Sequence, residues 1–364
     1  MKKLFLAAVF AAAASSAQAR PPTHHSSPRA IPLTVVSSTS IPSEMGGAFM
    51  SGSKCDPDGN LYIRKYATDR PLLGPVVKIT PDGERVAVFD PGSFSQLALD
   101  RADSFTPSPD GGLFLISQHG ILKPQTYALH FSSDGSALSP VRLEAGFEVH
   151  SFAAFLGGNF LLSGLQRDVT NAKDAGRKVT AVFSADGRIL EPISFHPALA
   201  GDSGEQGTSA PGKARPAAAA VAGSQSPEKL LPVMDLSEAE AGADGNLYVL
   251  RPGSPAMVSV ISPSGTILRT LKTPAPSSAV SPTAFHVSAN RVAISFWNDE
   301  LRNRDSREHF LVVVDAQTGQ KIATYAAPRE VGPTFACYSA DDSVFTFLSL
   351  GEGNSLDVIR AGPE

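Results

Sequence analysis

Cysteine, net charge and long hydrophobic runs are all scarce in this chain. Its 364 residues contain two cysteines, Cys55 and Cys337, which excludes a fold that depends on a disulfide framework. A formal net charge of −4 gives no reason to expect a nucleic-acid-binding protein. Beyond residues 1–19 no apolar run reaches the length of a membrane span, and no stretch has the pattern of a long amphipathic helix. The sequence therefore favours a globular domain of short strands.

The N-terminus has the order of features that is typical of secretory signal peptides. Two lysines precede an apolar segment from Leu4 to Ala14, and Ala17-Gln18-Ala19 supplies the small-x-small pattern of a cleavage site. We expect residues 1–19 to be removed and the mature protein to be periplasmic or secreted. Residues 20–30, with several Pro, Ser and His, are expected to form a flexible leader.

Turn residues are what the chain has in abundance. It contains 31 Gly and 29 Pro, and the segment Asp58-Gly59-Asn60-Leu61-Tyr62 returns as Asp244-Gly245-Asn246-Leu247-Tyr248. An Asp-Gly pair favours the positive φ of a tight hairpin turn, and the apolar residues after it predict a strand. The hairpin is therefore the repeating unit.

Two series of such hairpins alternate along the chain. The first series lies at Asp58-Gly59, Asp110-Gly111, Gly157-Gly158, Asp244-Gly245, Ala289-Asn290 and Asp341-Asp342, and the second at Asp82-Gly83, Asp134-Gly135, Asp186-Gly187, Ser264-Gly265 and Thr318-Gly319. The second series is spaced by 52, 52, 78 and 54 residues. Two hairpins make four strands, the content of a propeller blade. The long spacing contains residues 200–231, whose Ala, Gly, Ser and Pro predict a disordered insertion.

The sixth unit lacks one strand, because only residues 356–361 follow its hairpin. Residues 33–38 can supply the missing partner and so close a ring without open sheet edges. With its Asp-Gly-Asn-Leu-Tyr motif, the chain resembles the six-bladed β-propellers of the NHL-repeat, TolB-like and gluconolactonase-like superfamily over residues 31–364. The resemblance implies an all-β domain of six four-stranded antiparallel blades, and it implies a fold more than an activity.

The side of the ring opposite the Asp-Gly hairpins, which we call the loop face, is where we expect recognition. Loops between the second and third strands are longer there, and such loops on a rigid scaffold commonly carry function. Candidate ligand-binding residues at the starts of these loops are Arg64, Gln118, Gln166, Arg251, Trp297 and Asn298. They would form a basic rim around acidic crossings, although charges on exposed loops are also often simply solvated.

Two functions of different classes remain open. The first is an exported, non-catalytic binding or scaffold protein, monomeric, with a protein, peptide or glycan as partner and no cofactor. The alternative is a metal-dependent hydrolase or lyase with calcium at the axis, held by Glu44, Asp103, Glu148 and Glu238, because calcium accepts several carboxylates. Histidines such as His286 lack a ligand spacing and are interpreted as structural.

Cys55 and Cys337 each precede a first-series turn, so both are expected on innermost strands of blades that become neighbours when the ring closes. A disulfide across the closure would stabilise the fold by roughly 4 to 5 kcal/mol in the chain-entropy model. The alternative is a pair of buried free thiols, since bonding requires Cα atoms within about 7 Å.

Overall fold

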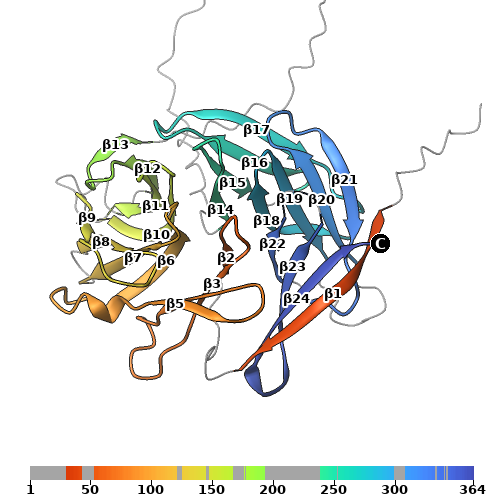
Figure 1. The fold of residues 1–364 in the computed structure, drawn as a ribbon. Helices are drawn as coiled ribbons and strands as arrows, with labels where there is room; N and C mark the ends of the chain where they lie inside the picture. The colour runs from red at the N-terminus through yellow and green to blue at the C-terminus, as the bar shows by residue number, and fades with distance from the viewer. Residues whose placement is uncertain are drawn as a thin grey trace, which may run out of the picture.

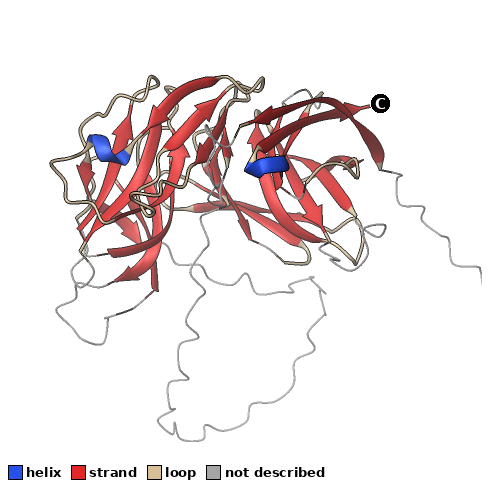
Figure 2. Cartoon of the chain, turned by 90° about the horizontal axis from the view of Figure 1, so that it is seen from below, coloured by secondary structure: helices blue, strands red, loops and turns tan. Residues whose placement is uncertain are grey.

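Figure 1 shows the computed structural model, an all-β chain. It describes residues 30–42, 53–120, 125–144, 147–166, 176, 178–192, 238–251, 253–298, 308–332, 334–339, 341 and 343–364. The predicted signal peptide, nearly all of the leader and the predicted insertion lie outside these residues. Apart from two short 3-10 helices, Pro91–Ser93 and Glu352–Asn354, the regular structure that is described consists of strands (Figure 2). The predicted all-β class is confirmed.

Four sheets of the described chain have four antiparallel strands each, and in each sheet the strands follow one another as in the sequence. The first sheet has β2 (Lys54–Cys55), β3 (Leu61–Arg64), β4 (Val76–Ile79) and β5 (Arg85–Phe89), and the second has β6 (Arg101–Pro107), β7 (Leu113–His119), β8 (Gln125–Phe131) and β9 (Val141–Arg142). The third has β10 (Phe147–Ala154), β11 (Phe160–Gln166), β12 (Lys178–Phe183) and β13 (Ile189–Pro192), and the fourth has β14 (Ala239–Ala241), β15 (Leu247–Arg251), β16 (Ala256–Ile261) and β17 (Ile267–Thr273).

The other strands form one eight-stranded sheet in the spatial order β18-β19-β20-β21-β1-β24-β23-β22. These strands are β1 (Ile31–Ile41), β18 (Ser281–Ser288), β19 (Arg291–Trp297), β20 (His309–Asp315), β21 (Lys321–Ala326), β22 (Thr334–Tyr338), β23 (Phe345–Leu350) and β24 (Leu356–Pro363). The predicted six separate blades thus become four separate sheets and one sheet of double width.

The double width results from one short parallel contact. Ile31 and Pro32, at the start of β1, pair with Tyr325 and Ala326 of β21. From Leu33 to Ile41 the strand instead runs antiparallel to β24, with a bulge after Val35. The sequence prediction placed this N-terminal strand beside residues 356–361, and that pairing is present. It did not foresee that the strand begins early enough to reach β21.

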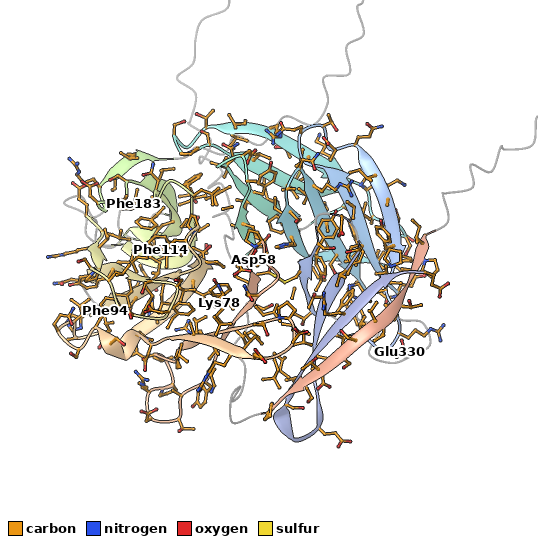
Figure 3. The ribbon with its side chains drawn as sticks, in the orientation of Figure 1. Asp58, Lys78, Phe94, Phe114, Phe183 and Glu330 are labelled. Atoms are coloured by element: carbon orange, nitrogen blue, oxygen red, sulfur yellow. A yellow bond between two sulfur atoms is a disulfide. The ribbon has the colours of Figure 1, made fainter. Side chains whose placement is uncertain are left out.

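The core is divided among layers between neighbouring sheets. Phe114 of the second sheet and Phe183 of the third belong to one buried cluster (Figure 3). Between the first sheet and the last strands of the chain, Ile63 and Val77 pack with Val358 of β24. Since middle strands are covered on both faces, their side chains are buried without alternation, as in β3, where all four residues are buried.

The Asp-Gly turns also explain how sheets dock. Gly135 has φ 90°, and a Cβ atom there would collide with the backbone carbonyl of Val88 in β5 of the preceding sheet. A Cβ atom at Gly187 would likewise collide with the backbone carbonyl of Arg142 in β9 of the preceding sheet. Glycine is therefore required at these second-series turns both for the left-handed backbone and for close approach to the neighbouring sheet.

The Tyr of the repeated motif links one sheet to the next. The Tyr62 hydroxyl donates a hydrogen bond to the carbonyl of Gly111 in the following sheet at 2.9 Å. Beside it, Lys78 Nζ lies 3.0 Å from Asp56 Oδ2. Burial is the main cause that raises the pKa of Tyr62 to about 12, so the hydroxyl stays protonated and remains a donor.

The second copy of the motif uses different partners for the same purpose. The Tyr248 hydroxyl donates to Asp244 Oδ2 at 3.0 Å and accepts from Arg269 Nη2 at 2.9 Å. Arg269 Nε then donates to the carbonyl of Ala316 in the eight-stranded sheet at 3.0 Å. The motif is thus a fold determinant, because its polar groups are engaged in contacts between sheets.

Cys55 and Cys337 are joined by a disulfide between β2 and β22. Their Cα atoms are 5.8 Å apart, and 282 residues of sequence separate them. Cys337 is buried, and Cys55 packs against the same apolar cluster. The bond therefore links the first sheet to the last strands of the chain.

We predict that replacing both cysteines by serine will lower the free energy of unfolding by about 2 to 5 kcal/mol, because the unfolded chain loses a long covalent loop. Urea unfolding with and without reductant is the measurement. Reductant should bring the wild type close to the variant and leave the variant unchanged. Two titratable thiols in unfolded, unreduced protein would contradict the bond.

Candidate functional site: charged residues at the axis

The first strands of the sheets gather at the centre of the molecule (Figure 1). They contact one another in the order β2, β6, β10, β14, β18, β22, and β22 in turn contacts β2. We call the line around which they gather the axis. Side chains that leave these strands toward it come from parts of the sequence far from one another, so the axis is where a composite site can form.

Three charged or titratable residues meet there, and we call them the axial cluster: Lys54 of β2, Glu240 of β14 and His286 of β18. Lys54 Nζ donates to the carbonyl of Ala239 at 3.1 Å, across 185 residues of sequence. Glu240 Oε2 lies 2.9 Å from His286 Nδ1 and accepts the backbone N–H of Val287 at 2.8 Å. The cluster therefore connects three innermost strands.

The axial cluster is shielded from solvent, and its charges depend on one another. The side chains of His286 and Glu240 are 6% and 13% exposed. Burial by itself would raise the pKa of Glu240, but the His286 ring, Lys54 and the N–H of Val287 together outweigh burial and lower this pKa. Glu240 is therefore a carboxylate at neutral pH. Its contribution to stability is present above the unfolded pKa of about 4.3 and is lost as pH falls.

A carboxylate against a histidine ring nitrogen can orient the ring for proton transfer. Here the same carboxylate oxygen also accepts a backbone N–H, and the neighbouring residue Ala239 accepts from Lys54. The arrangement therefore holds the innermost strands in place through one buried carboxylate.

A sequence signal for this cluster existed and was missed. Lys54 is the fourth residue before Asp58, and Glu240 is the fourth before Asp244, so the two occupy the same position in the two best copies of the repeat. Opposite charges at one repeat position of inner strands predict that they face each other across the axis. From the sequence alone, His286 is interpreted only as a structural histidine.

A second buried polar set lies between β18, β19 and β20. The Ser295 hydroxyl is 2.9 Å from His309 Nε2 and 3.2 Å from the Thr283 hydroxyl. Trp297 and Phe347 pack edge-on against the His309 ring, at centroid distances of 5.2 and 5.3 Å. Burial lowers the pKa of His309 to about 4, so this ring is neutral at physiological pH. Ser295 is fully buried, which keeps a substrate from reaching it.

The predicted basic rim is not assembled as an exposed set. Arg64 is 3% exposed and donates to the carbonyl of Ala102, and Gln118 is equally buried and accepts from Arg101 Nη2 at 2.6 Å. Both residues lie at or near the ends of strands that neighbouring sheets cover, so their polar ends bond to the adjacent backbone and side chains. Arg251 is half-buried at the end of β15. Gln166 ends β11, and its side chain lies outside the described set.

Trp297 and Asn298 stand next to each other at the end of β19. Trp297 is half-buried and contacts His309, as described above. Asn298 is buried, and its side-chain oxygen accepts the backbone N–H of Glu308 at 2.9 Å while its own N–H donates to the Glu308 carbonyl at 3.1 Å. Asn298 therefore closes the base of a loop, and Trp297 is the aromatic residue nearest to that loop entrance.

The four proposed calcium ligands are only partly described. Glu44 and the side chain of Asp103 lie outside the described set. Glu148, in β10, and Glu238, just before β14, are half-buried, and each interacts with other groups of the protein. Among the side chains that are described, no group of three or more His, Cys, Asp or Glu could hold a metal ion.

Comparisons with known proteins bear on the fold alone. No family model matches the chain, and no curated protein is similar to it in sequence. A member of the DUF4221 family from Bacteroides vulgatus is 10% identical with a TM-score of 0.50, covering 92% of this chain and 99% of its own. The fold is β-propeller-like. This conclusion rests on the antiparallel sheets arranged around the axis, with the DUF4221 structure as a similar fold.

Two further solved structures have lower TM-scores. A protein of unknown function from Bacteroides caccae is 13% identical with a TM-score of 0.42, covering 77% of this chain and 82% of its own. The Neurospora crassa Pan2 WD40 domain is 9% identical with a TM-score of 0.45, covering 92% and 97%. In the described part of the propeller-like chain, no helix is long and apolar enough to cross a membrane.

We predict that Glu240→Gln will destabilise the fold by about 3 kcal/mol, because the buried carboxylate that accepts the N–H of Val287 and lies against His286 is lost. Urea unfolding at pH 7 measures the change. Glu84→Gln makes the same chemical change on an exposed residue beside a second-series hairpin, and it should alter stability by less than about 0.5 kcal/mol. Equal stability of the two variants would show that the axial cluster contributes nothing.

The buried His309 predicts a loss of stability in acid. The pKa of His309 is near 4 in the folded state and about 6.5 in the unfolded state. The neutral ring therefore contributes fully to the free energy of unfolding above pH 6.5, and about 3 kcal/mol of this contribution is lost as the pH falls toward 4. Unfolding free energies of His309→Gln should fall less steeply over this range. His119→Gln, at a half-exposed histidine, is the control and should follow the wild type. Identical slopes for His309→Gln and the wild type would refute the assignment.

Proposed function

We propose that this protein is an exported, non-catalytic six-bladed β-propeller that binds a protein, peptide or glycan through the loop face around its axis. The contacts of the axial cluster with the backbone of neighbouring strands carry this proposal. Lys54 donates to the carbonyl of Ala239 and Glu240 accepts the N–H of Val287, so these side chains hold the innermost strands as a rigid frame requires, and recognition falls to the residues that border the loops.

Six blades are supported by the composition of the eight-stranded sheet. Strands β18 to β21 form one antiparallel series of four, and β22, β23, β24 and β1 form another. Only the two pairs at Ile31 and Pro32 join these series. The cyclic contacts of the innermost strands and the buried layer between β24 and the first sheet support a closed ring.

A place in the NHL-repeat, TolB-like and gluconolactonase-like superfamily is supported by the Asp-Gly-Asn-Leu-Tyr motif in two of these blades. The contact of Tyr62 with the next sheet, and the contact that Tyr248 makes through Arg269, give the motif a role in building the fold. Export is supported by the pattern of residues 1–19, and the disulfide is consistent with an oxidising compartment.

Among the predicted ligand residues whose side chains are described, Arg251 and Trp297 stay partly accessible near the loop face. Arg251 ends β15, and Trp297 ends β19 in the next blade. A cation and an indole ring offer charge, hydrogen bonds and stacking to a peptide or a glycan. Trp297 is also the only tryptophan of the chain, so its fluorescence reports on this region alone.

The proposal is tested by capture of partners from the exporting cell's envelope on immobilised mature protein, with Arg251→Glu and Arg188→Glu compared. Arg188 lies on an Asp-Gly hairpin, has a 73% exposed side chain and pairs with Asp186, so it controls for the charge reversal. We expect Arg251→Glu to weaken capture at least about tenfold and Arg188→Glu to leave it unchanged.

Trp297 fluorescence supplies the second measurement, because the captured component should change its emission when added back to the wild type. Equal capture by both variants, without a change in emission, would overturn recognition at the loop face. Failure of the wild type to retain any component would overturn the binding function itself.

A further inference from the structure

Strand β1 is the last strand, farthest from the axis, in the series β22, β23, β24 and β1. It differs from the outermost strands of the other four-stranded series of the described chain, which are β5, β9, β13, β17 and β21. Those strands contain charged residues, which guard an open edge against pairing with another chain: Arg85 in β5, Arg142 in β9, Glu191 in β13, Arg269 and Lys272 in β17, and Lys321 in β21. Two of them are also very short, β9 with two residues and β13 with four. By contrast β1 has eleven residues, IPLTVVSSTSI, and none is charged.

Much of the outer edge of β1 has no described strand beside it. The contact with β21 ends at Pro32, and at the far end the side chain of Thr39 lies close to Gly83 of a second-series hairpin. Between these points, residues 34–38, apart from Val36 in the bulge, pair with β24 on one side, and the segment has no backbone hydrogen bond to any described residue on the other. In an antiparallel strand, every second residue directs its N–H and C=O away from the partner, so this edge can accept another strand.

A groove of about 520 Å³ lies beside this edge, where β1 and β21 diverge. It is lined by Leu33, Thr34, Val35, Ser38, Pro328, Glu330 and Ile359. Leu33 and Ile359 form a buried apolar floor, and the exposed Val35 lies along its side. Glu330, labelled in Figure 3, lies in the segment that follows β21 and contributes a carboxylate to the lining of the groove.

We propose that this edge is a binding site for an extended segment of a partner protein, which adds to the sheet as a strand beside β1. The main-chain groups of residues 34–38 would supply hydrogen bonds, while the groove accepts β-branched side chains of the added strand. Opposite Glu330 the segment carries a lysine or arginine, because a cation there neutralises the carboxylate as it loses water. The bulge after Val35 sets where the added strand starts and makes the register specific.

The probe is a capped synthetic peptide of alternating valine and threonine with one central lysine, labelled with a fluorophore and titrated into the mature protein. Val35→Lys places a charge on the edge and should weaken binding by about tenfold or more, as charged edge residues do. Val86→Lys is the matched control, because Val86 is similarly exposed on the outermost strand β5, and it should leave binding unchanged.

Charge exchange tests the role of Glu330. Glu330→Lys should weaken binding of the lysine peptide by about tenfold, and it should strengthen binding of a peptide with glutamate in place of the lysine by a similar factor. Hydrogen exchange gives the geometry, since binding should slow exchange of the edge amides of residues 34–38. Absence of binding of the lysine peptide, or binding without this protection, would overturn the proposal.

The other occupants of this edge give different results. A second copy of the chain would appear as a dimer in sedimentation that Val35→Lys dissociates, and the N-terminal leader would appear as peptide binding that occurs only after residues 20–29 are deleted. Either result overturns the proposal of a separate partner. Arg251→Glu should leave peptide binding unchanged, so failure at this edge and failure of recognition at the loop face are distinguishable.

Discussion

The antiparallel pairing of β1 with β24 is the interaction on which the rest of the molecule depends. It brings a strand from the start of the chain to its last strand and completes the second half of the eight-stranded sheet. Once β24 is held, its apolar side chains cover the first sheet, and Cys337 reaches Cys55. Such a contact between distant segments has a high entropic cost, which the many buried side chains between sheets and the disulfide together offset.

The axis shows a second constraint, one that repetition imposes. Equivalent positions of the innermost strands face the same line, so a charge repeated in every unit would create repulsion in a region of low dielectric. In this chain Lys54 and Glu240 have opposite signs at one repeat position, and the ring of His286 lies beside Glu240. The two copies of the motif are therefore nearly identical in the turn and the following strand and different just before it, where the side chains face the axis.

The strand that completes the second half of the eight-stranded sheet also has an outer flank that no charged residue of its own protects. Its lack of charge suits the pairing with β24, whose Val358, Ile359 and Ala361 are buried. The outer flank of the same strand has no covering strand between Pro32 and Thr39 among the described residues. The side chains that permit closure are thus the ones that make β1 suited to accept a further strand.

The sequence by itself determined the strands and the turns, because these depend on local rules, and it determined the partner of the N-terminal strand, because the last unit lacks one strand. Asp-Gly pairs specify hairpins whatever surrounds them, and their spacing reveals the four-stranded unit. Packing decided the rest. Arg64 and Gln118 look like loop residues in the sequence, yet neighbouring sheets bury them. Whether β1 reaches β21, and how closely Lys54 approaches the backbone of Ala239, depend on distances between sheets that no local pattern encodes. Those distances follow from how the side chains of successive sheets fill the space between them.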